Sequence, residues 1–420
     1  MLTIKENATR QIQGMIDRIH AKGGGTAVVP DGVHECGTLY LRSGVRLHLE
    51  HGALIRGSTD LADYPLHSDF SIRCFADWNG MRSLIYADAQ HRIALTGSGT
   101  IDGMGASFRC HGTDKDGRPR LIQFIGCEDV LVQDLHLSNS GLWLQHYLGC
   151  ERVRITGLTA WNHVQPNNDF VDVEGCRDVR IQGCTSDTDD DGITLKSGCA
   201  RPTEDVVVSN CIIRSHCNAI KCGTESNGGF RNISITNCTI APSMKPDGIH
   251  GLEKGICGIA LESVDGGILE NVNVSNITIR GTASPIFIRL GNRNRSFQEA
   301  DTGSSGSGAL RKVQLSSINV AEAGPIGCLI SGFPGHFITD IVLRDIDIQL
   351  ASTSPDARSA ESVPEKSDSY PEATQFGHLP ASGFFVRHAR NIRFHKVEIR
   401  PHADDPRPTF CKLDAEVFVV

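Results

Sequence analysis

The chain has 420 residues, with 41 lysines and arginines against 49 aspartates and glutamates, and a formal net charge of -8. This acidic balance argues against nucleic acid or an anionic membrane as a partner and favours a smaller or neutral one. The length would allow two or three domains, although repetitive all-β folds of this size also form a single unit.

The first predicted element is a helix over residues 7–21, which three glycines at 23–25 end. Its apolar residues at helical spacing are Ile12, Met15, Ile16 and Ile19. We expect residues 1–25 to form an N-terminal cap. No apolar run resembles a signal peptide or a membrane span, so we expect a cytoplasmic protein, or a secreted or periplasmic one if a signal was removed.

Short strands are predicted next at 26–29, 38–42 and 45–49, separated by Pro, Gly and Ser. From Val130 onward, apolar residues recur at positions i, i+2, i+5 and i+7. The nine copies begin at Val130, Val153, Val179, Val206, Ile233, Val272, Val313, Ile341 and Ile392. Several copies are 23 to 28 residues apart, which is the signature of an internal repeat.

Position i+4 of the repeat indicates its geometry. Seven of the nine copies carry Gly, Asn or Asp there, and these residues tolerate a left-handed backbone. Each copy is therefore predicted to be a strand, a sharp corner and a second strand. Because no copy can bury its apolar face alone, successive copies must stack with parallel strands about 4.8 Å apart. The sequence predicts an all-β fold in which residues 1–420 form a single parallel β-helix.

The 15 cysteines follow the same register, since Cys184, Cys211 and Cys238 share position i+5. We interpret most of them as buried thiols rather than disulfides or ligands. Wider gaps between copies predict loops that leave the coil. Residues 294–310 and the long surface loop 351–380 are expected to line a groove or to contact a partner chain, so an oligomer could form through them.

Residues 167–198 contain the densest acidic cluster of the chain. Its members are Asp169, Asp172, Glu174, Asp178, Asp187, Asp189, Asp190 and Asp191. Like charges this close repel one another, so a purely structural role would cost stability. A solvated acidic turn or a calcium site is the alternative interpretation.

Asp169 and Asp190 are 21 residues apart, close to one coil, so stacking predicts that they lie on neighbouring rungs of one face. Two carboxylates held in this way can have split pKa values, one staying protonated as an acid and the other ionised as a base. Cleavage of a glycosidic bond with inversion uses such a pair, separated by about 6.5–9.5 Å to admit water.

The chain resembles glycoside hydrolase family 28, the polygalacturonase and rhamnogalacturonase family of right-handed parallel β-helices. The resemblance extends from Gly-Gly-Gly-Thr at 23–26 and Gly-Ser-Gly-Thr-Ile-Asp-Gly-Met-Gly at 97–105 through at least Arg295. Its most specific matches are Asn167-Asn168-Asp169 to the family's Asn-Thr-Asp and Asp189-Asp190-Asp191 to its Gly-Asp-Asp. The resemblance implies that Asp190 is the general acid, and that Asp169 and Asp191 hold and deprotonate the attacking water.

Two departures from the family pattern concern the substrate. The family's Gly-His-Gly falls at His216, Cys217 and Asn218, where the histidine is displaced by one place and strand alternation would turn it to the other face. We expect His216 either to reach the groove from a bulge and contact substrate or to have a non-catalytic role.

The family's Arg-Ile-Lys, which grips a galacturonate carboxylate, falls at 258–262, where neither cation is present. Without these charge-assisted bonds, worth about 1.5–3 kcal/mol each, a plain polygalacturonase is not expected. Glu262 is predicted to repel a uronate or to bond neutral hydroxyls. The other candidate substrate contacts, each with a structural alternative, are Asn167, Lys196, Lys221, Glu225 and Arg289. Arg293 and Arg295 could add positive charge.

We therefore predict an inverting glycoside hydrolase that is exo-acting on pectic or related plant cell-wall oligosaccharides and needs no cofactor or metal, since no zinc-ligand spacing is found. Two alternatives are kept open. A β-helix polysaccharide lyase would use the carboxylates to bind calcium and a residue such as Lys196 to take the proton. A non-catalytic, tailspike-like β-helix would bind carbohydrate without turnover.

Overall fold

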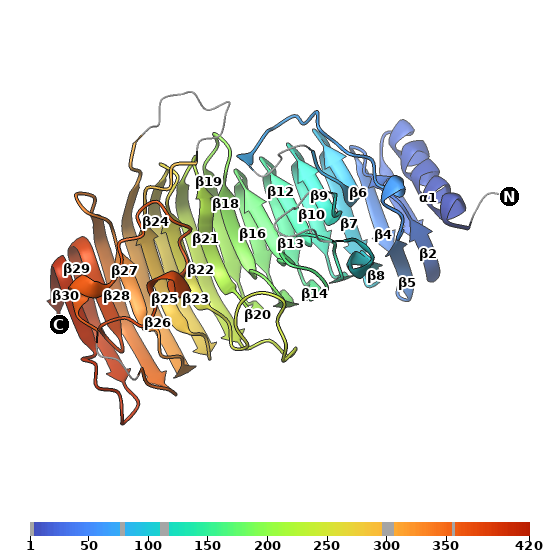
Figure 1. Cartoon of the computed structure of the whole chain (residues 1–420). Helices are drawn as coiled ribbons and strands as arrows, with labels where there is room; N and C mark the ends of the chain where they lie inside the picture. Colours follow the sequence, from blue (N-terminus) through green and yellow to red (C-terminus); the bar gives the residue numbers. More distant parts are fainter. Residues whose placement is uncertain (1–3, 76–79, 110–116, 296–305, 355–357) are drawn as a thin grey trace.

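The computed structural model describes residues 4–75, 80–109, 117–295, 306–354 and 358–420. These residues form a right-handed parallel β-helix whose coils stack from the N-terminal helix α1 (Ile4–Ala21) to the C-terminal strands (Figure 1). Ile12 and Ile16 of α1 are buried against the first coils, so the predicted cap and its apolar face are confirmed. No helix within the described ranges is long and apolar enough to cross a membrane.

Three parallel sheets run along the solenoid. The first contains β1 (Gly25–Val29), β4 (Val45–Leu49), β7 (His91–Gly97), β10 (Glu128–Gln133), β13 (Glu151–Thr156), β16 (Arg177–Gln182) and β19 (Thr203–Ser209). The second contains β2 (Gly32–Cys36), β5 (Ala53–Gly57), β8 (Thr100–Asp102), β11 (His136–Ser138), β14 (Thr159–Asn162), β17 (Thr185–Thr188) and β20 (Ile212–Ser215). Both sheets continue through the long strands β22 (Phe230–Ala241), β24 (Ile268–Arg280), β26 (Ala309–Ala323) and β28 (Ile338–Leu350).

The third sheet carries most of the candidate residues. It contains β3 (Leu39–Tyr40), β6 (Ser83–Asp88), β9 (Arg120–Ile125), β12 (Gln145–Leu148), β15 (Val171–Glu174), β18 (Ile193–Ser197), β21 (Asn218–Ser226), β23 (Cys257–Ser263), β25 (Ser284–Leu290) and β27 (Cys328–Ser331). The last strands, β29 (Phe384–Arg400) and β30 (Phe410–Val419), close the stack. Short 3-10 turns occur at η1 (Leu61–Asp63), η3 (Gly105–Ser107), η4 (Ala360–Ser362) and η5 (Ala373–Phe376).

The register confirms the predicted repeat. The first apolar residue of each copy pairs with that of the next, from Val130 with Val153 through to Ile341 with Ile392. All nine residues at i+4 have positive φ, including Ser317 (+53°) and Lys396 (+50°), which are not residue types that favour it. The corner is therefore a property of the coil itself, and stacking stabilises it where the residue type does not.

The predicted cysteine rows lie inside the coil, where Cys184, Cys211 and Cys238 are each at most 2% exposed. Every cysteine of the described chain is a free thiol. These residues fill the interior together with the stacked Val, Ile and Leu side chains of the three sheets.

The segment 351–380 packs on the coil rather than projecting from it, in the part that the structure describes. Val363, Phe376 and Leu379 are buried in a second apolar cluster with Phe287 of β25 and Phe385 of β29. The segment thus covers the outer face of the third sheet over its C-terminal coils (Figure 1). Most of the other predicted loop, 294–310, lies outside the described residues.

Candidate active site

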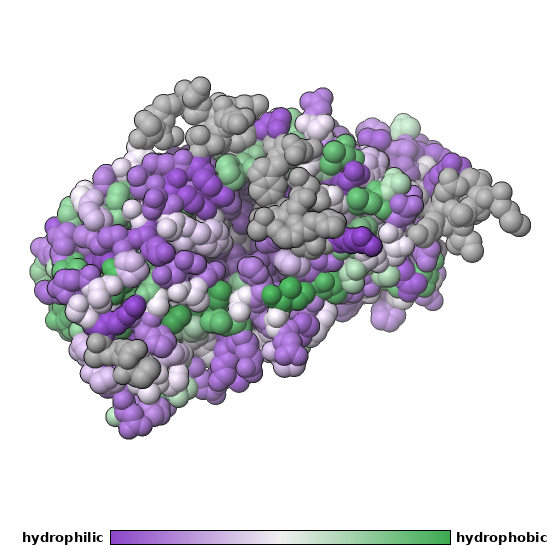
Figure 2. Space-filling view, viewed as in Figure 1, coloured by the Kyte–Doolittle hydropathy of each residue, from purple (hydrophilic) through white to green (hydrophobic). Residues whose placement is uncertain are grey.

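The acidic cluster is built where the chain enters β15 and β18 of the third sheet. Val171 pairs with Ile193, so Asp169 stacks on Asp191, and the backbone N–H of Asp190 donates to the carbonyl of Asn168 at 3.3 Å. The spacing of 21 residues between Asp169 and Asp190 is one short of this register, so Asp191 takes the position directly next to Asp169 on the neighbouring rung. The three carboxylates nonetheless gather at one place, and Figure 2 shows this face hollowed near the middle of the solenoid, over β18 and β21.

Asp190 is held by its neighbours on the turn before β18. One carboxylate oxygen accepts from the backbone N–H of Asp191 at 2.8 Å, and the other accepts from Asn167 Nδ2 at 3.3 Å. Its carbonyl accepts from Ser215 Oγ at 2.6 Å, which fixes the backbone. At 9% exposure, Asp190 is the most accessible of the three acids. It is thus the member of the cluster best placed to meet a leaving-group oxygen.

Asp191 is held as a carboxylate. Oδ1 accepts from the backbone N–H of Asn218 at 3.0 Å and from Asn218 Nδ2 at 2.7 Å, and Oδ2 accepts from Lys221 Nζ at 2.9 Å. Burial acts to raise the pKa of Asp191, but Lys221, Lys196 and the hydrogen bonds outweigh it and hold the pKa below the ordinary value. An ionised Asp191 has the charge state that a general base requires.

Asp169 has the opposite tendency. Its side chain is buried, and its Oδ1 has no hydrogen-bond partner within the described chain. Burial, followed by the charges of Asp172, Asp190 and Asp191, raises its pKa well above the ordinary value. The sequence assigned both Asp169 and Asp191 to the base. In the structure the two differ, because the raised pKa of Asp169 favours its protonated form and the lowered pKa of Asp191 favours its ionised form.

The nearest oxygens of Asp190 and Asp191 lie within 4.8 Å of each other. Asp190 and Asp191 are therefore close enough to act on one glycosidic bond. The spacing of about 6.5–9.5 Å was predicted for Asp169 and Asp190, and for that pair it stays a prediction.

Lys196 and Glu225 lie on the neighbouring part of the same face. Lys196 Nζ is 3.4 Å from Asp172 Oδ1 and 3.2 Å from Glu225 Oε2, and it lies 4.9 Å from the centre of the Trp143 ring. Burial raises the pKa of Asp172 to about 7 although Lys196 opposes the shift. The Lys196 ammonium group thus offsets the negative charge of the carboxylates around it and lies against the Trp143 ring.

Lys221 connects the acids to Glu262 and to the segment 351–380. Besides Asp191, its Nζ donates to the hydroxyl of Tyr370 at 3.2 Å. Glu262 is 1% exposed, and burial raises its pKa to about 8 despite the opposing charge of Lys221. Near neutral pH Glu262 is therefore largely protonated, so it can donate a hydrogen bond.

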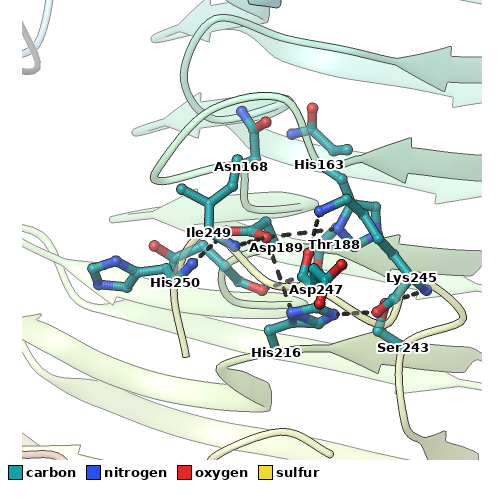
Figure 3. Close-up of polar contacts among 12 residues, drawn as sticks. His163, Asn168, Thr188, Asp189, His216, Ser243, Lys245, Asp247, Ile249 and His250 are labelled. Carbon is teal, nitrogen blue, oxygen red and sulfur yellow. Dashed lines mark hydrogen bonds and ion pairs between the residues drawn. The ribbon is translucent and has the colours of Figure 1, made fainter. Parts of the chain in front are cut away.

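Asp189 and His216 point toward residues 245–250 of the loop after β22 (Figure 3). The carboxylate of Asp189 accepts from the backbone N–H groups of Ile249 at 2.7 Å and His250 at 2.8 Å. His216 is fully buried, and its Nε2 donates to the carbonyl of Lys245 at 2.9 Å. Both side chains anchor the loop after β22, so the prediction that His216 contacts substrate is wrong.

His216 lies in the turn between β20 and β21, whereas Asn218, the first residue of β21, is the side chain that reaches Asp191. Of the two hypotheses offered for His216, the non-catalytic one agrees with its position.

Arg289 is likewise structural rather than a substrate contact. It is 1% exposed and donates to Ser331 Oγ at 2.7 Å, to the carbonyl of Gly332 at 2.6 Å and to that of Glu365 at 2.6 Å. Its guanidinium also lies 5.3 Å from the centre of the Phe376 ring. Covered by the segment 351–380, Arg289 cannot reach a sugar in the groove.

Arg293 and Arg295 are also engaged with carboxylates. Arg293 Nε donates to Asp265 Oδ1 at 2.9 Å, and Arg295 donates to Glu225 Oε1 at 2.8 Å. Their charges are therefore balanced within the protein.

A sequence profile of the glycosyl hydrolases family 28 matches residues 26–365, which include the acidic cluster and the sheet that carries it. The chain belongs to glycosyl hydrolase family 28. A Vitis vinifera relative described as a probable polygalacturonase is 25% identical over 366 residues, covering 83% of this chain and 72% of the relative.

Solved structures of family 28 share the fold. The exopolygalacturonase from Yersinia enterocolitica superposes with a TM-score of 0.74 at 18% identity, covering 98% of this chain and 75% of that chain. The hyperthermoactive exopolygalacturonase from Thermotoga maritima has a TM-score of 0.68 at 20% identity, covering 93% and 88%.

Membership of family 28 makes the protein a glycoside hydrolase of an inverting family. The two alternatives kept open from the sequence, a polysaccharide lyase and a non-catalytic binding protein, are therefore not retained. Four residues of this family 28 site were not selected from the sequence: Trp143, Asp172, Asn218 and Tyr370. Asp172 could have been selected, because it lies in the acidic cluster on an outward-facing strand position, one coil before Thr194.

Proposed function

We propose that this glycoside hydrolase removes sugar units from the end of a pectic oligosaccharide and that it is not a typical polygalacturonase. Asp190 is the general acid in this proposal, and Asp191 is the base that deprotonates the attacking water. The observation that carries the assignment is the contrast between Asp191, bonded to Lys221 and Asn218, and the more exposed Asp190 beside it.

The position of the segment 351–380 supports the exo mode. Tyr370 contacts Lys221, and the carbonyl of Ser367 accepts from the backbone N–H of Asn292 at 2.6 Å, so the segment covers the sheet directly beyond β21. The rungs that carry the site residues run from β12 to β21, which is roughly 14 Å at about 4.8 Å per rung. A wall just past the acids favours a chain end over an internal site.

The pairing of the lysines supports a substrate unit that carries no carboxylate at this position. Lys196 is balanced by Asp172 and Glu225, and Lys221 by Asp191. Where the family's cationic clamp was expected, Glu262 presents a buried carboxyl group instead. A uronate here would meet the ionised Asp191, while Lys196 and Lys221 are already paired with the protein's own carboxylates.

The test compares polygalacturonan, oligogalacturonides, rhamnogalacturonan oligosaccharides and neutral aryl glycosides as substrates. Chromatography of early products distinguishes the two modes, because an exo enzyme releases one product size from the first turnovers. We expect a rhamnogalacturonan-type or neutral substrate to have a higher kcat/KM than polygalacturonan. Polygalacturonan as the best substrate, or a ladder of early products, would contradict the proposal.

Asp190→Asn tests the acid assignment on whichever substrate is cleaved. The variant keeps the size of the side chain, so we expect a folded protein with kcat lowered by about 10²–10⁴-fold, the usual contribution of general acid–base catalysis. NMR of the first-formed anomer should show inversion. Near wild-type turnover in a correctly folded variant would remove Asp190 from this role.

A further inference from the structure

Cys217 lies at the entry to β21, beside the two acids. The thiol sulfur and one carboxylate oxygen each from Asp190 and Asp191 all lie within 4.8 Å of one another. The cysteine is 3% exposed, and its backbone is fixed because its N–H donates to Ser215 Oγ at 2.8 Å and its carbonyl accepts from Ile256 N at 2.8 Å. The sulfur is therefore held beside the carboxylates.

A fourth group points to a ligand at this place. Asp169 stacks in register on Asp191, is 3% exposed, and has an Oδ1 without a hydrogen-bond partner within the described residues. A buried carboxylate oxygen that makes no hydrogen bond is costly unless something else satisfies it. Burial and the charges of Asp190 and Asp191 oppose ionisation of Asp169, and a divalent cation at this place would offset both.

The thiol decides which cation fits. Calcium and magnesium prefer oxygen ligands, whereas zinc and other borderline or soft ions accept thiolate together with carboxylate. Zinc bonds to oxygen and sulfur are about 2.0–2.3 Å long, so the ligand atoms of a tetrahedral site lie about 3.3–3.8 Å apart. The three donors would have to approach one another by at most about 1–1.5 Å, and the Asp191 oxygen that ligates the ion would give up its bond to Lys221 or Asn218.

We propose that Asp190, Asp191 and Cys217 form a binding site for a thiophilic divalent cation, Zn²⁺ or Cd²⁺, and that the bound cation stops hydrolysis. On binding, the Cys217 S–H bond breaks, its proton passes to solvent, and the thiolate and two carboxylates ligate the ion. With both acids occupied, neither can exchange a proton with water or the leaving group. The inhibition rests on the proposed roles of Asp190 and Asp191, whereas the binding rests on geometry alone.

The test uses Cd²⁺, because a cadmium–thiolate bond gives an ultraviolet charge-transfer absorption that reports binding without any substrate. We expect the wild-type protein to bind one equivalent with this absorption and to lose activity, with recovery on adding a chelator. An excess of Ca²⁺ or Mg²⁺ should not compete. Cys411, the one described cysteine that is not fully buried, provides the control, and Cys411→Ser should behave as the wild type.

Cys217→Ser and Cys217→Ala should keep metal-free hydrolysis, lose the absorption and weaken inhibition by Cd²⁺ at least tenfold. Two variants are used so that one poorly folded protein does not decide the result. Unchanged Cd²⁺ binding in a folded Cys217 variant, or loss of the absorption in Cys411→Ser, would overturn the site. An absorption without inhibition would overturn the inhibitory role, while failure to cleave any glycoside counts only against the proposed function.

Discussion

Replacing Lys221 with Met tests whether this buried ammonium sets the charge of Asp191. The Nζ is 2.9 Å from Asp191 Oδ2, and the two side chains are only 2% and 5% exposed. Methionine keeps a similar length and apolar stem but removes the charge and the hydrogen bond. Asn218 would still hold the other oxygen of Asp191.

Lys221→Met should change two quantities, the pKa of Asp191 and the stability of the protein. An opposite charge at this distance lowers the pKa of a carboxyl group by about 1–3 units, so its removal should raise the pKa of Asp191 by a similar amount. Each unit corresponds to 1.36 kcal/mol, or about tenfold in the ionised fraction below the pKa. Removing one partner of a buried ion pair also costs about 3–5 kcal/mol of stability.

The assay is the pH dependence of kcat/KM, measured where both proteins are folded. Because the pKa of Asp191 is lowered in the wild type, its ionised form persists to low pH, and activity is lost only as the pH falls through that value. In Lys221→Met we expect the acid limb to move upward by about 1–3 pH units, with activity recovering at higher pH.

A control for the removal of a lysine charge is Lys254→Met. Lys254 pairs with Glu322 at 3.9 Å, with side chains 56% and 48% exposed, and exposed pairs contribute little. This variant should leave both the pH profile and the stability unchanged. An unmoved acid limb in a folded Lys221→Met enzyme would refute the assignment of Asp191 as the ionised base that Lys221 supports.

Three further outcomes are expected. Folding raises the pKa of Asp172 to about 7, so ionisation of this group opposes folding as the pH rises from about 4 to 7. In denaturant titrations between pH 4 and 8, the free energy of unfolding of Asp172→Asn should rise by up to about 4 kcal/mol relative to that of the wild type. A difference that stays constant with pH would exclude this effect. His216→Phe loses the hydrogen bond to Lys245 and should lower the free energy of unfolding by about 1–3 kcal/mol, with KM unchanged. A raised KM without lost stability would instead indicate that His216 contacts substrate. Arg289→Met should lower the melting temperature but leave KM unaltered, since its donors bond the protein's own acceptors; a selective loss of affinity in calorimetric titration with substrate would speak against a structural role.

The sequence was sufficient to predict the coil because the repeat is local. Apolar positions and the corner at i+4 recur within each copy, so stacking follows from burial alone, and even Ser317 and Lys396 adopt the predicted backbone. A second left-handed corner, one residue before each copy, was not recognised, since it is occupied by residues as different as Arg152 and Asn232.

Details of the site depend on coil lengths that the repeat does not specify. The coil from Val171 to Ile193 is one residue longer than the spacing assumed for Asp169 and Asp190, which is why Asp191 takes the stacked position. Tyr370 is 149 residues away from Lys221 in the chain and could not be placed by periodicity. The same limit applies to Arg289, whose acceptors include the carbonyl of Glu365 in a distant segment.

The bonds between the segment 351–380 and the C-terminal coils have a consequence for how the molecule comes apart. A simple solenoid can lose its terminal coils one at a time, because each touches only its neighbours. Here Arg289 of β25 and Arg387 of β29 both donate to backbone carbonyls between Val363 and Glu365. The last coils are therefore expected to unfold together as one cooperative unit, which hydrogen exchange would detect as a block of amides with a common opening free energy.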